Sequence, residues 1–153
     1  MKEESKIKRY ERVYEQIKEL VGATTHPISR MATINAILHH KFSYYYWTGF
    51  YELIDGDLLV SAYQGPVACL KLKKDTGVCW AGINTQKSVV VANVHDFPGH
   101  IACSSASNSE IVVPVFNKEK EVVAVLDVDS KAYGSFDEVD RLGLEKIVAL
   151  IYS

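Results

Sequence analysis

Apolar residues near the beginning of the chain recur at intervals of three and four, which is the spacing of an amphipathic helix. The first run predicts a helix over Lys2–Val21, and the second predicts a helix that ends at His40. Thr24 or Thr25 is expected to cap this second helix, with Pro27 in its first turn, where a missing backbone donor does no harm. The sequence therefore begins with two helices.

Further along, short stretches alternate apolar and polar residues between turn residues, which is typical of strands. Asp55-Gly56 lies between the first two stretches and predicts a tight hairpin turn. The predicted strands are Tyr45–Ile54, Asp57–Tyr63, a short strand at or beside Cys69, a buried strand over Ser88–Val91, and a hairpin of Ile111–Phe116 with Glu121–Val128. A short helix is predicted over Gly77–Thr85.

A third amphipathic run follows Ser135-Phe-Asp-Glu138, which predicts a capping box at the start of a last helix. The order of helix, helix, strands and helix describes a central antiparallel sheet with the N- and C-terminal helices packed on one face. We therefore predict an α+β fold, and residues 1–153 are expected to form one domain. His95–Asn108 is predicted to be a long loop, because it contains Pro98 and Gly99.

The composition is that of an ordinary globular protein, with 48% apolar and 24% charged residues. A net charge of −2 argues against a nucleic-acid footprint, so no phosphate-backbone partner is expected. The sequence shows neither an apolar run of membrane-spanning length nor a secretion signal. We expect a cytoplasmic protein without a membrane partner, whose three cysteines serve chemistry rather than a disulfide framework.

The predicted long loop carries Cys103 together with His95 and His100, and Glu110 follows it. A long ordered loop in a small domain is usually functional, and these residue types activate, orient or protonate at a reaction centre. We interpret Cys103 as a redox nucleophile. Two other interpretations stay open: a Cys–His hydrolase that uses one of the two histidines, and simple packing of a small buried cysteine. The histidine spacings match no zinc pattern, so neither a metal nor a bound cofactor is expected.

Several short segments resemble the GAF-fold free methionine-(R)-sulfoxide reductases, and the block from Phe97 to Pro114 is the most specific of them. The matching segments are Trp47-Thr-Gly-Phe-Tyr51, Ala68-Cys69, Gly77-Val-Cys79, Asp96–Cys103, Ser105–Ser107, Ser109–Pro114 and Val125–Ser130. The resemblance implies a six-stranded GAF domain that reduces the R epimer of free methionine sulfoxide. It also implies that thioredoxin recycles the enzyme as an external reductant.

The resemblance also implies roles for individual residues. Cys103 matches the family's sulfur-attacking cysteine, Cys69 its usual resolving cysteine, and Cys79 a third cysteine that can assist recycling. The implied substrate-binding residues are the carboxylates of Glu110, Asp127 and Asp129 and the aromatic side chains of Trp47 and Tyr51, which hold the methyl end of the ligand. Trp80 departs from the pattern, because the family usually has glycine after Gly-Val-Cys.

Reduction of a sulfoxide needs a thiolate that attacks sulfur and an acid that protonates the oxygen. The attack leaves a sulfenic acid, which a second thiol converts to a disulfide that an external dithiol reduces. Asp127 and Asp129 lie two residues apart on one predicted strand and share a face, while Glu110 enters an adjoining strand. Three converging acids repel one another, so at least one is expected to hold a proton near neutral pH.

Plainer interpretations of the same residues remain open. Asp127 and Asp129 could be acids at a strand end, and Trp47 and Tyr51 could be core packing. A different functional class is a GAF module that senses a small ligand or redox state without catalysis. Such a module needs a cavity but no pair of thiols, and it is normally attached to an output domain, which we do not expect here. The helical faces near both ends of the sequence could serve a homodimer.

Overall fold

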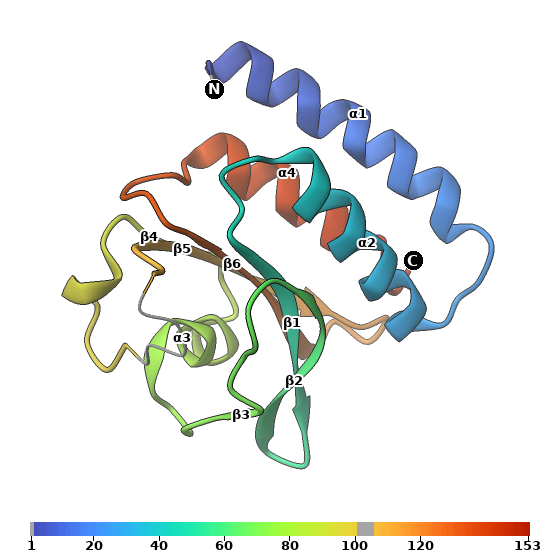
Figure 1. Cartoon of the computed structure of the whole chain (residues 1–153). Coiled ribbons are helices and arrows are strands. Elements are labelled where there is room, and N and C mark those ends of the chain that lie inside the picture. The colour runs from blue at the N-terminus through green and yellow to red at the C-terminus, as the bar shows by residue number, and fades with distance from the viewer. Residues whose placement is uncertain (1, 101–105) are drawn as a thin grey trace.

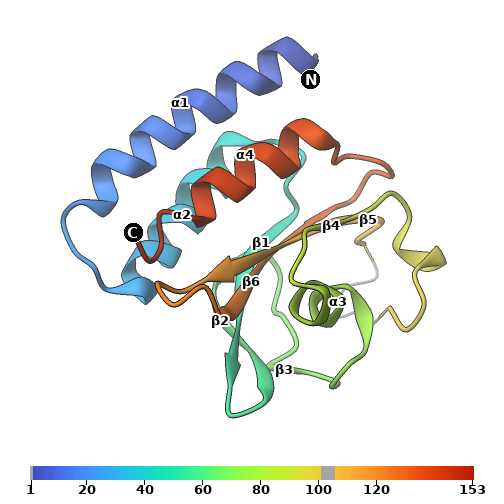
Figure 2. The ribbon, with the colours of Figure 1, turned by 180° about the vertical axis from the view of Figure 1, so that it is seen from behind.

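The computed structural model of the chain describes residues 2–100 and 106–153, which form one antiparallel sheet with helices on both faces (Figures 1 and 2). The α-helices within these residues are α1 (Glu3–Val21), α2 (Pro27–Lys41), α3 (Gly77–Thr85) and α4 (Glu138–Val148). The strands are β1 (Trp47–Ile54), β2 (Asp57–Gln64), β3 (Lys71–Leu72), β4 (Val89–Val91), β5 (Ser109–Phe116) and β6 (Val122–Ser130). Their order in the sheet is β3-β2-β1-β6-β5-β4, which confirms the predicted α+β fold with six strands.

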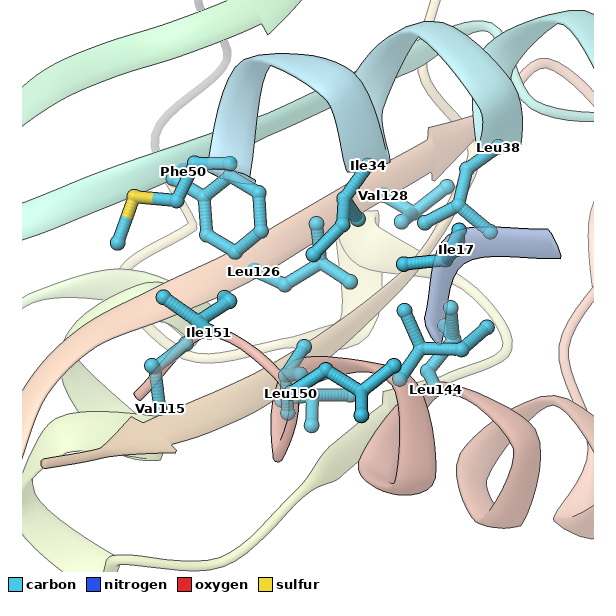
Figure 3. Packing of buried hydrophobic residues seen from close by; sticks show 14 of the residues in the cluster. Ile17, Ile34, Leu38, Phe50, Val115, Leu126, Val128, Leu144, Leu150 and Ile151 are labelled. Atoms are coloured by element: carbon cyan, nitrogen blue, oxygen red, sulfur yellow. The ribbon is translucent and has the colours of Figure 1, made fainter. Parts of the chain in front are cut away.

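Helices α1, α2 and α4 cover one face of the sheet, as predicted for the N- and C-terminal helices (Figure 1). Each helix presents an apolar stripe, because its apolar residues recur every three or four positions, and the stripe is removed from water against the sheet. Figure 3 shows Ile17, Ile34 and Leu144 from the helices gathered with Leu126 and Val128 from β6. All five side chains are buried, so this layer is the main apolar core.

Helix α3 lies on the opposite face of the sheet, with the segments that connect it to β3 and β4 (Figure 2). Gly82 lets the helix approach closely, because a Cβ at this position would lie 2.7 Å from a methyl carbon of Val112. A second cluster of buried residues fills this layer and includes Val78, Trp80 and Val125. Because strand residues alternate between the two faces, neighbouring positions on β6 serve different layers.

The cap of α4 lies two residues later than predicted. Asp137 rather than Ser135 is the N-cap, and Asp140 completes the box in the place predicted for Glu138. Both registers satisfy the sequence pattern, because cap-forming and acidic residues occur at several neighbouring positions. The later register places Asp140 so that its buried carboxylate also accepts a hydrogen bond from Lys6 Nζ at 2.6 Å.

Two other local predictions are corrected by the structure. Helix α2 starts directly after His26, and the hydroxyl of Thr24 accepts a hydrogen bond from the His26 backbone instead of capping the helix. Among the described strands β4 lies at the edge of the sheet and pairs with β5, so Val90 is 39% exposed rather than buried. Across residues 2–100 and 106–153, no helix combines the length and the apolar composition that a membrane crossing needs.

Candidate active site

A cavity lies on the α3 side of the sheet, bordered by that helix, by strands β1, β5 and β6 and by the segment before β3. Six of the predicted site residues line it, namely Trp47, Tyr51, Cys79, Glu110, Asp127 and Asp129. Ala68, the sequence neighbour of Cys69, lines it as well. The predicted nucleophile Cys103 lies outside the described residues. The cavity therefore brings together every described residue of the predicted site except Cys69, which borders it.

The three acids share the cavity because of the pairing of β5, β6 and β1. Glu110 on β5 pairs with Asp129 on β6, and Asp129 pairs in turn with Trp47 on β1. Asp127 lies two residues before Asp129 and so projects from the same face of the sheet. Glu110 and Asp127 are each only 5% exposed, which rules out the interpretation that they are solvated strand-end acids.

Burial and mutual repulsion raise the pKa of all three carboxyl groups well above the usual range. For each acid the largest cause is the loss of water around the charged form. A neighbouring charge adds to this effect, since Asp127 acts on Glu110, Asp129 acts on Asp127, and Glu110 acts on Asp129. The raised pKa values favour the protonated form of the carboxyl groups, and a protonated carboxyl group can serve as an acid.

One oxygen of Asp127, Oδ1, is buried without a hydrogen-bond partner in the part of the chain that the structure describes. A buried acceptor that loses its water costs about 1–3 kcal/mol when nothing replaces that water. Asp127, which carries this unsatisfied oxygen, lines the cavity. A ligand with a hydrogen-bond donor, such as an ammonium group, would supply the missing partner.

An aromatic stack forms one wall of the cavity. The ring of Trp47 stacks on those of Tyr51 and Tyr63, at centroid distances of 5.7 and 5.2 Å. Gly49 makes room for the indole, because a Cβ there would lie 2.5 Å from a Trp47 ring carbon. Trp47 Nε1 donates a hydrogen bond to the Pro66 carbonyl at 3.0 Å and so ties this wall to the segment before β3. Tyr63, which sequence reasoning did not assign to the site, does not line the cavity itself but supports Trp47 from β2, where it pairs with Gly49.

The two described cysteines differ in state. Cys79 is a buried free thiol in the first turn of α3, and burial beside Asp127 and Glu110 raises its pKa well above the usual range. A thiol that stays protonated is a weak nucleophile, so Cys79 suits hydrogen bonding and packing better than attack. Cys69 is half-buried and disulfide-bonded, and it lies beside β3 as predicted.

Two residues that stand on either side of Cys103 in the sequence, His100 and Ser107, line the cavity. Burial and the neighbouring His95 lower the pKa of His100, so its ring is neutral at pH 7. His95 is not among the lining residues, and its Nε2 lies 2.9 Å from Asn108 Oδ1, a contact that joins two parts of the predicted loop. Sequence reasoning did not assign Ser107 a role, although it stands within the family-specific block.

Trp80, the departure from the family pattern, leaves the helix around Cys79 regular. Helix α3 runs without interruption from Gly77 to Thr85, and Trp80 is buried within the second cluster. Its indole Nε1 donates to the Leu72 carbonyl at 3.4 Å, and Trp80 does not line the cavity. The Trp80 side chain therefore connects α3 to β3 through this hydrogen bond.

Cys79 Sγ and one oxygen each of Glu110 and Asp127 lie within 4.8 Å of one another, close enough to share a metal ion. Metal binding must displace the protons of its ligands, and the raised pKa of all three groups opposes that step. The arrangement therefore suits a hydrogen-bonding organic ligand better than a metal ion.

Comparisons with known proteins agree with this geometry. A model of the GAF domain family matches residues 41–151. The chain is 34% identical over 145 residues to the free methionine-R-sulfoxide reductase of Escherichia coli strain K12, an alignment that covers 95% of this chain and 87% of that protein.

Solved structures give the same picture. The free methionine-R-sulfoxide reductase of Neisseria meningitidis in complex with its substrate matches with a TM-score of 0.88 and 37% identity, over 94% of this chain and 86% of that chain. A putative GAF sensor protein from Burkholderia vietnamiensis matches with a TM-score of 0.90 and 38% identity, over 97% of this chain and 94% of that chain. The chain therefore belongs to the GAF-domain family of free methionine-R-sulfoxide reductases.

Proposed function

We propose that the chain reduces the R epimer of free methionine sulfoxide to methionine and that thioredoxin returns it to the reduced state. One observation carries the proposal: three acids, two of them buried, and an aromatic stack line one cavity, which the segment bearing a disulfide-bonded cysteine borders. The reductases of Escherichia coli and Neisseria meningitidis, to which the chain is similar, support the same reaction.

The cavity suits a free amino acid. Such a substrate carries an ammonium group, which a methionine sulfoxide within a polypeptide lacks. The unsatisfied Oδ1 of Asp127 and the neighbouring Glu110 and Asp129 offer acceptors for that ammonium group. Trp47 and Tyr51 offer apolar surface for the S-methyl end. In this scheme the acids select a free substrate over a protein-bound one.

The reaction begins when the Cys103 thiolate attacks the sulfoxide sulfur while one of the acids delivers a proton to the oxygen. The raised pKa of the carboxyl groups suits this task, because it favours the protonated form that can deliver the proton. The oxygen passes to Cys103 as a sulfenic acid, and methionine leaves. The Cys69 thiol then condenses with the sulfenic acid, which releases the oxygen as water and forms a disulfide.

Thioredoxin completes the cycle by transferring two electrons from its dithiol to this disulfide, and no bound cofactor is needed. The disulfide-bonded state of Cys69 is consistent with its role as the resolving thiol. Cys79 acts as a hydrogen-bonding neighbour of the acids, since burial raises its pKa and weakens it as a nucleophile. Because the cycle draws on thioredoxin, we place it in a reducing compartment, the cytoplasm.

The test supplies racemic free methionine sulfoxide with thioredoxin, thioredoxin reductase and NADPH. Half of the racemate should be consumed, a peptide that contains methionine sulfoxide should not react, and Cys103→Ser should abolish turnover. Mass spectrometry after one equivalent of substrate should find a Cys69–Cys103 linkage. A Cys79–Cys103 linkage would give the resolving role to Cys79, and survival of both epimers would contradict the proposed reaction.

The alternative function is a GAF module that binds a small ligand without catalysis. The similarity to a putative GAF sensor protein supports this second function. A sensor of this kind would bind methionine or its sulfoxide in the same cavity without consuming either compound. Calorimetric titration of the wild-type chain, combined with the turnover assay, separates the two functions. Binding without turnover in the presence of thioredoxin would establish the sensor.

We further propose that the chain forms a homodimer through α1. This helix exposes Ile7 and Leu20, at 41% and 48% of their surface, on the two sides of its buried apolar stripe. Sedimentation velocity should show a dimer that Leu20→Asp converts to a monomer. A wild-type chain that sediments as a monomer would contradict this assembly.

A further inference from the structure

The segment Pro66–Leu70, which precedes β3, exposes two apolar side chains beside Cys69. Val67 is 85% exposed and Leu70 is 79% exposed, the highest values of any large apolar residue in the described chain. They stand two residues before and one residue after a disulfide-bonded cysteine. We call Val67 and Leu70 the Cys69 patch.

The backbone of this segment is held at both ends, so the exposure of the patch is not that of a loose loop. The Pro66 carbonyl accepts a hydrogen bond from Trp47 Nε1 at 3.0 Å, and the Leu70 carbonyl accepts one from the backbone N–H of Val60 at 2.9 Å. Two large apolar side chains that an anchored segment keeps in water contribute no free energy of burial to the folded chain. Such a patch is typical of a contact surface.

Disulfide exchange fixes where a protein reductant must lie. The exchange passes through a mixed disulfide, in which the two Cα atoms approach to within about 7 Å. A partner bonded to Cys69 in this way therefore covers the residues on either side of it. Leu70 directly follows Cys69 and Val67 stands two residues before it, so both lie within this covered area, and the exposed Lys71, Lys73 and Lys74 add a basic margin.

We infer that the Cys69 patch is the docking surface for thioredoxin, through apolar contacts around the attacking thiol and an acidic margin on the partner. The inference rests on the proposed function, because it concerns the reductant of the same cycle. The inference requires that a thiolate of thioredoxin attacks the sulfur of Cys69 rather than that of Cys103.

The exchange balances in two steps. A thiolate of the partner attacks Cys69 Sγ, the S–S bond of the chain breaks, and Cys103 leaves as a thiolate, ready for the next substrate. The second thiolate of the partner then attacks its own sulfur in the mixed disulfide, so Cys69 leaves as a thiolate and the partner becomes a disulfide. Two electrons and two protons pass from the partner dithiol to the chain.

The test follows reduction of the oxidised full-length chain in a single turnover without methionine sulfoxide. Leu70→Ser should lower the second-order rate constant for reduction by thioredoxin about tenfold, the loss of one apolar anchor. The same variant should react with dithiothreitol, which needs no docking surface, at the wild-type rate. Leu142→Ser, which changes a 56% exposed leucine on α4, is the matched control and should leave both rates unchanged.

A thioredoxin variant that lacks its second cysteine should trap a mixed disulfide, which peptide mapping should assign to Cys69. Trapping at Cys103, or equal rates for Leu70→Ser and Leu142→Ser with thioredoxin, would overturn the inference. Equal slowing with thioredoxin and dithiothreitol would overturn it too, since that result reports a disturbed disulfide. Because the assay contains no substrate, a chain that fails to reduce methionine sulfoxide yet shows the Leu70 effect would refute only the proposed function.

Discussion

At the scale of single residues, the buried carboxyl group of Glu110 makes the free energy of unfolding depend on pH. Burial raises its pKa, so the folded chain holds a proton that the unfolded chain releases above about pH 4.3. Between that pH and the raised pKa, the folded state binds more protons than the unfolded state. Its free energy of unfolding therefore falls as the pH rises through this window, and the full value is present only below it.

Replacing Glu110 with glutamine removes this titration and keeps the shape of the side chain. Relative to the wild type, Glu110→Gln should become more stable as the pH rises, by up to about 1.4 kcal/mol for each pH unit within the window. Urea unfolding at about pH 5, 7 and 8.5 measures the difference. Glu119→Gln, at the exposed β5–β6 turn, should show no such trend. A difference between Glu110→Gln and wild type that stays constant with pH would contradict the raised pKa.

The acids of the site could be predicted from sequence because period-two alternation places Asp127 and Asp129 on one face of a strand. The aromatic wall could be predicted only in part. Tyr63 reaches Trp47 through a register shift between Gly49 and Tyr51, and this irregularity has no local signature in the sequence. Contacts of this kind depend on pairing between strands, so periodicity within one strand cannot predict them.

At the scale of elements, the segment before β3 depends on Gly65. This residue has a φ of +124°, and a Cβ there would lie 2.8 Å from Trp47 Cδ1 and 3.0 Å from the Tyr46 carbonyl oxygen. Alanine would strain the backbone and push the segment away from the indole that anchors it. Both the aromatic wall and the position of Cys69 rely on this close contact.

Gly65→Ala should therefore destabilise the chain by about 1–3 kcal/mol and slow thioredoxin-dependent turnover. Gly134→Ala is the matched control, because Gly134 also has a positive φ, +59°, but has open space where a Cβ would stand. The control should lose about 1 kcal/mol and keep its activity. Urea unfolding and steady-state kinetics measure both variants, and equal turnover of the two would contradict the role of the contact.

The start of α4 shows what local pattern leaves undecided. The sequence predicts the capping box and its helix, but the register is settled by Asp140, whose carboxylate is fully buried. It accepts hydrogen bonds from Lys6 Nζ at 2.6 Å and from the hydroxyls of Tyr10 and Tyr44 at 2.7 and 2.6 Å. These partners come from distant parts of the chain, so no pattern within the helix could reveal them.

Removing this carboxylate should disturb α1 as well as α4. Asp140→Ala removes the closest partner of the buried Lys6 ammonium, leaving only longer contacts of 3.4 Å with Asp137 and the Ser135 carbonyl, and should cost about 3–5 kcal/mol of unfolding free energy. Asp137→Ala, which removes the helix cap and a solvent-exposed ion pair with Lys6 at 3.4 Å, should cost only about 1–2 kcal/mol. Thermal and urea unfolding compare the two variants, and similar losses for both would show that Asp140 acts only through the capping box.

At the scale of the whole molecule, the sheet separates two tasks. The face under α1, α2 and α4 carries the large apolar core, whereas the face under α3 carries the cavity and its acids. This separation follows from strand geometry, because successive residues of β6 point to opposite faces. Sequence patterns predicted the first face well, since apolar periodicity encodes it directly. The second face had to be inferred from the family resemblance, because its residues mix acids, aromatics and a thiol and follow no apolar periodicity.

Neighbouring residues on β6 test this division directly. Leu126 is fully buried in the helical layer, and Leu126→Ala should cost about 2–5 kcal/mol of unfolding free energy while kcat/KM for free methionine (R)-sulfoxide changes less than about twofold. Asp127→Asn should behave in the opposite way, because an amide, unlike a carboxyl group, cannot ionise to balance the charge of the bound ammonium group. Its KM should rise roughly tenfold or more with little loss of stability, since the buried acid holds its raised pKa at the expense of folding. Kinetics well below the unfolding transition, paired with urea unfolding, separate the two effects. If Leu126→Ala raised KM as much as Asp127→Asn, the two faces of the sheet would have to be coupled through the strand, and the division of tasks would fail.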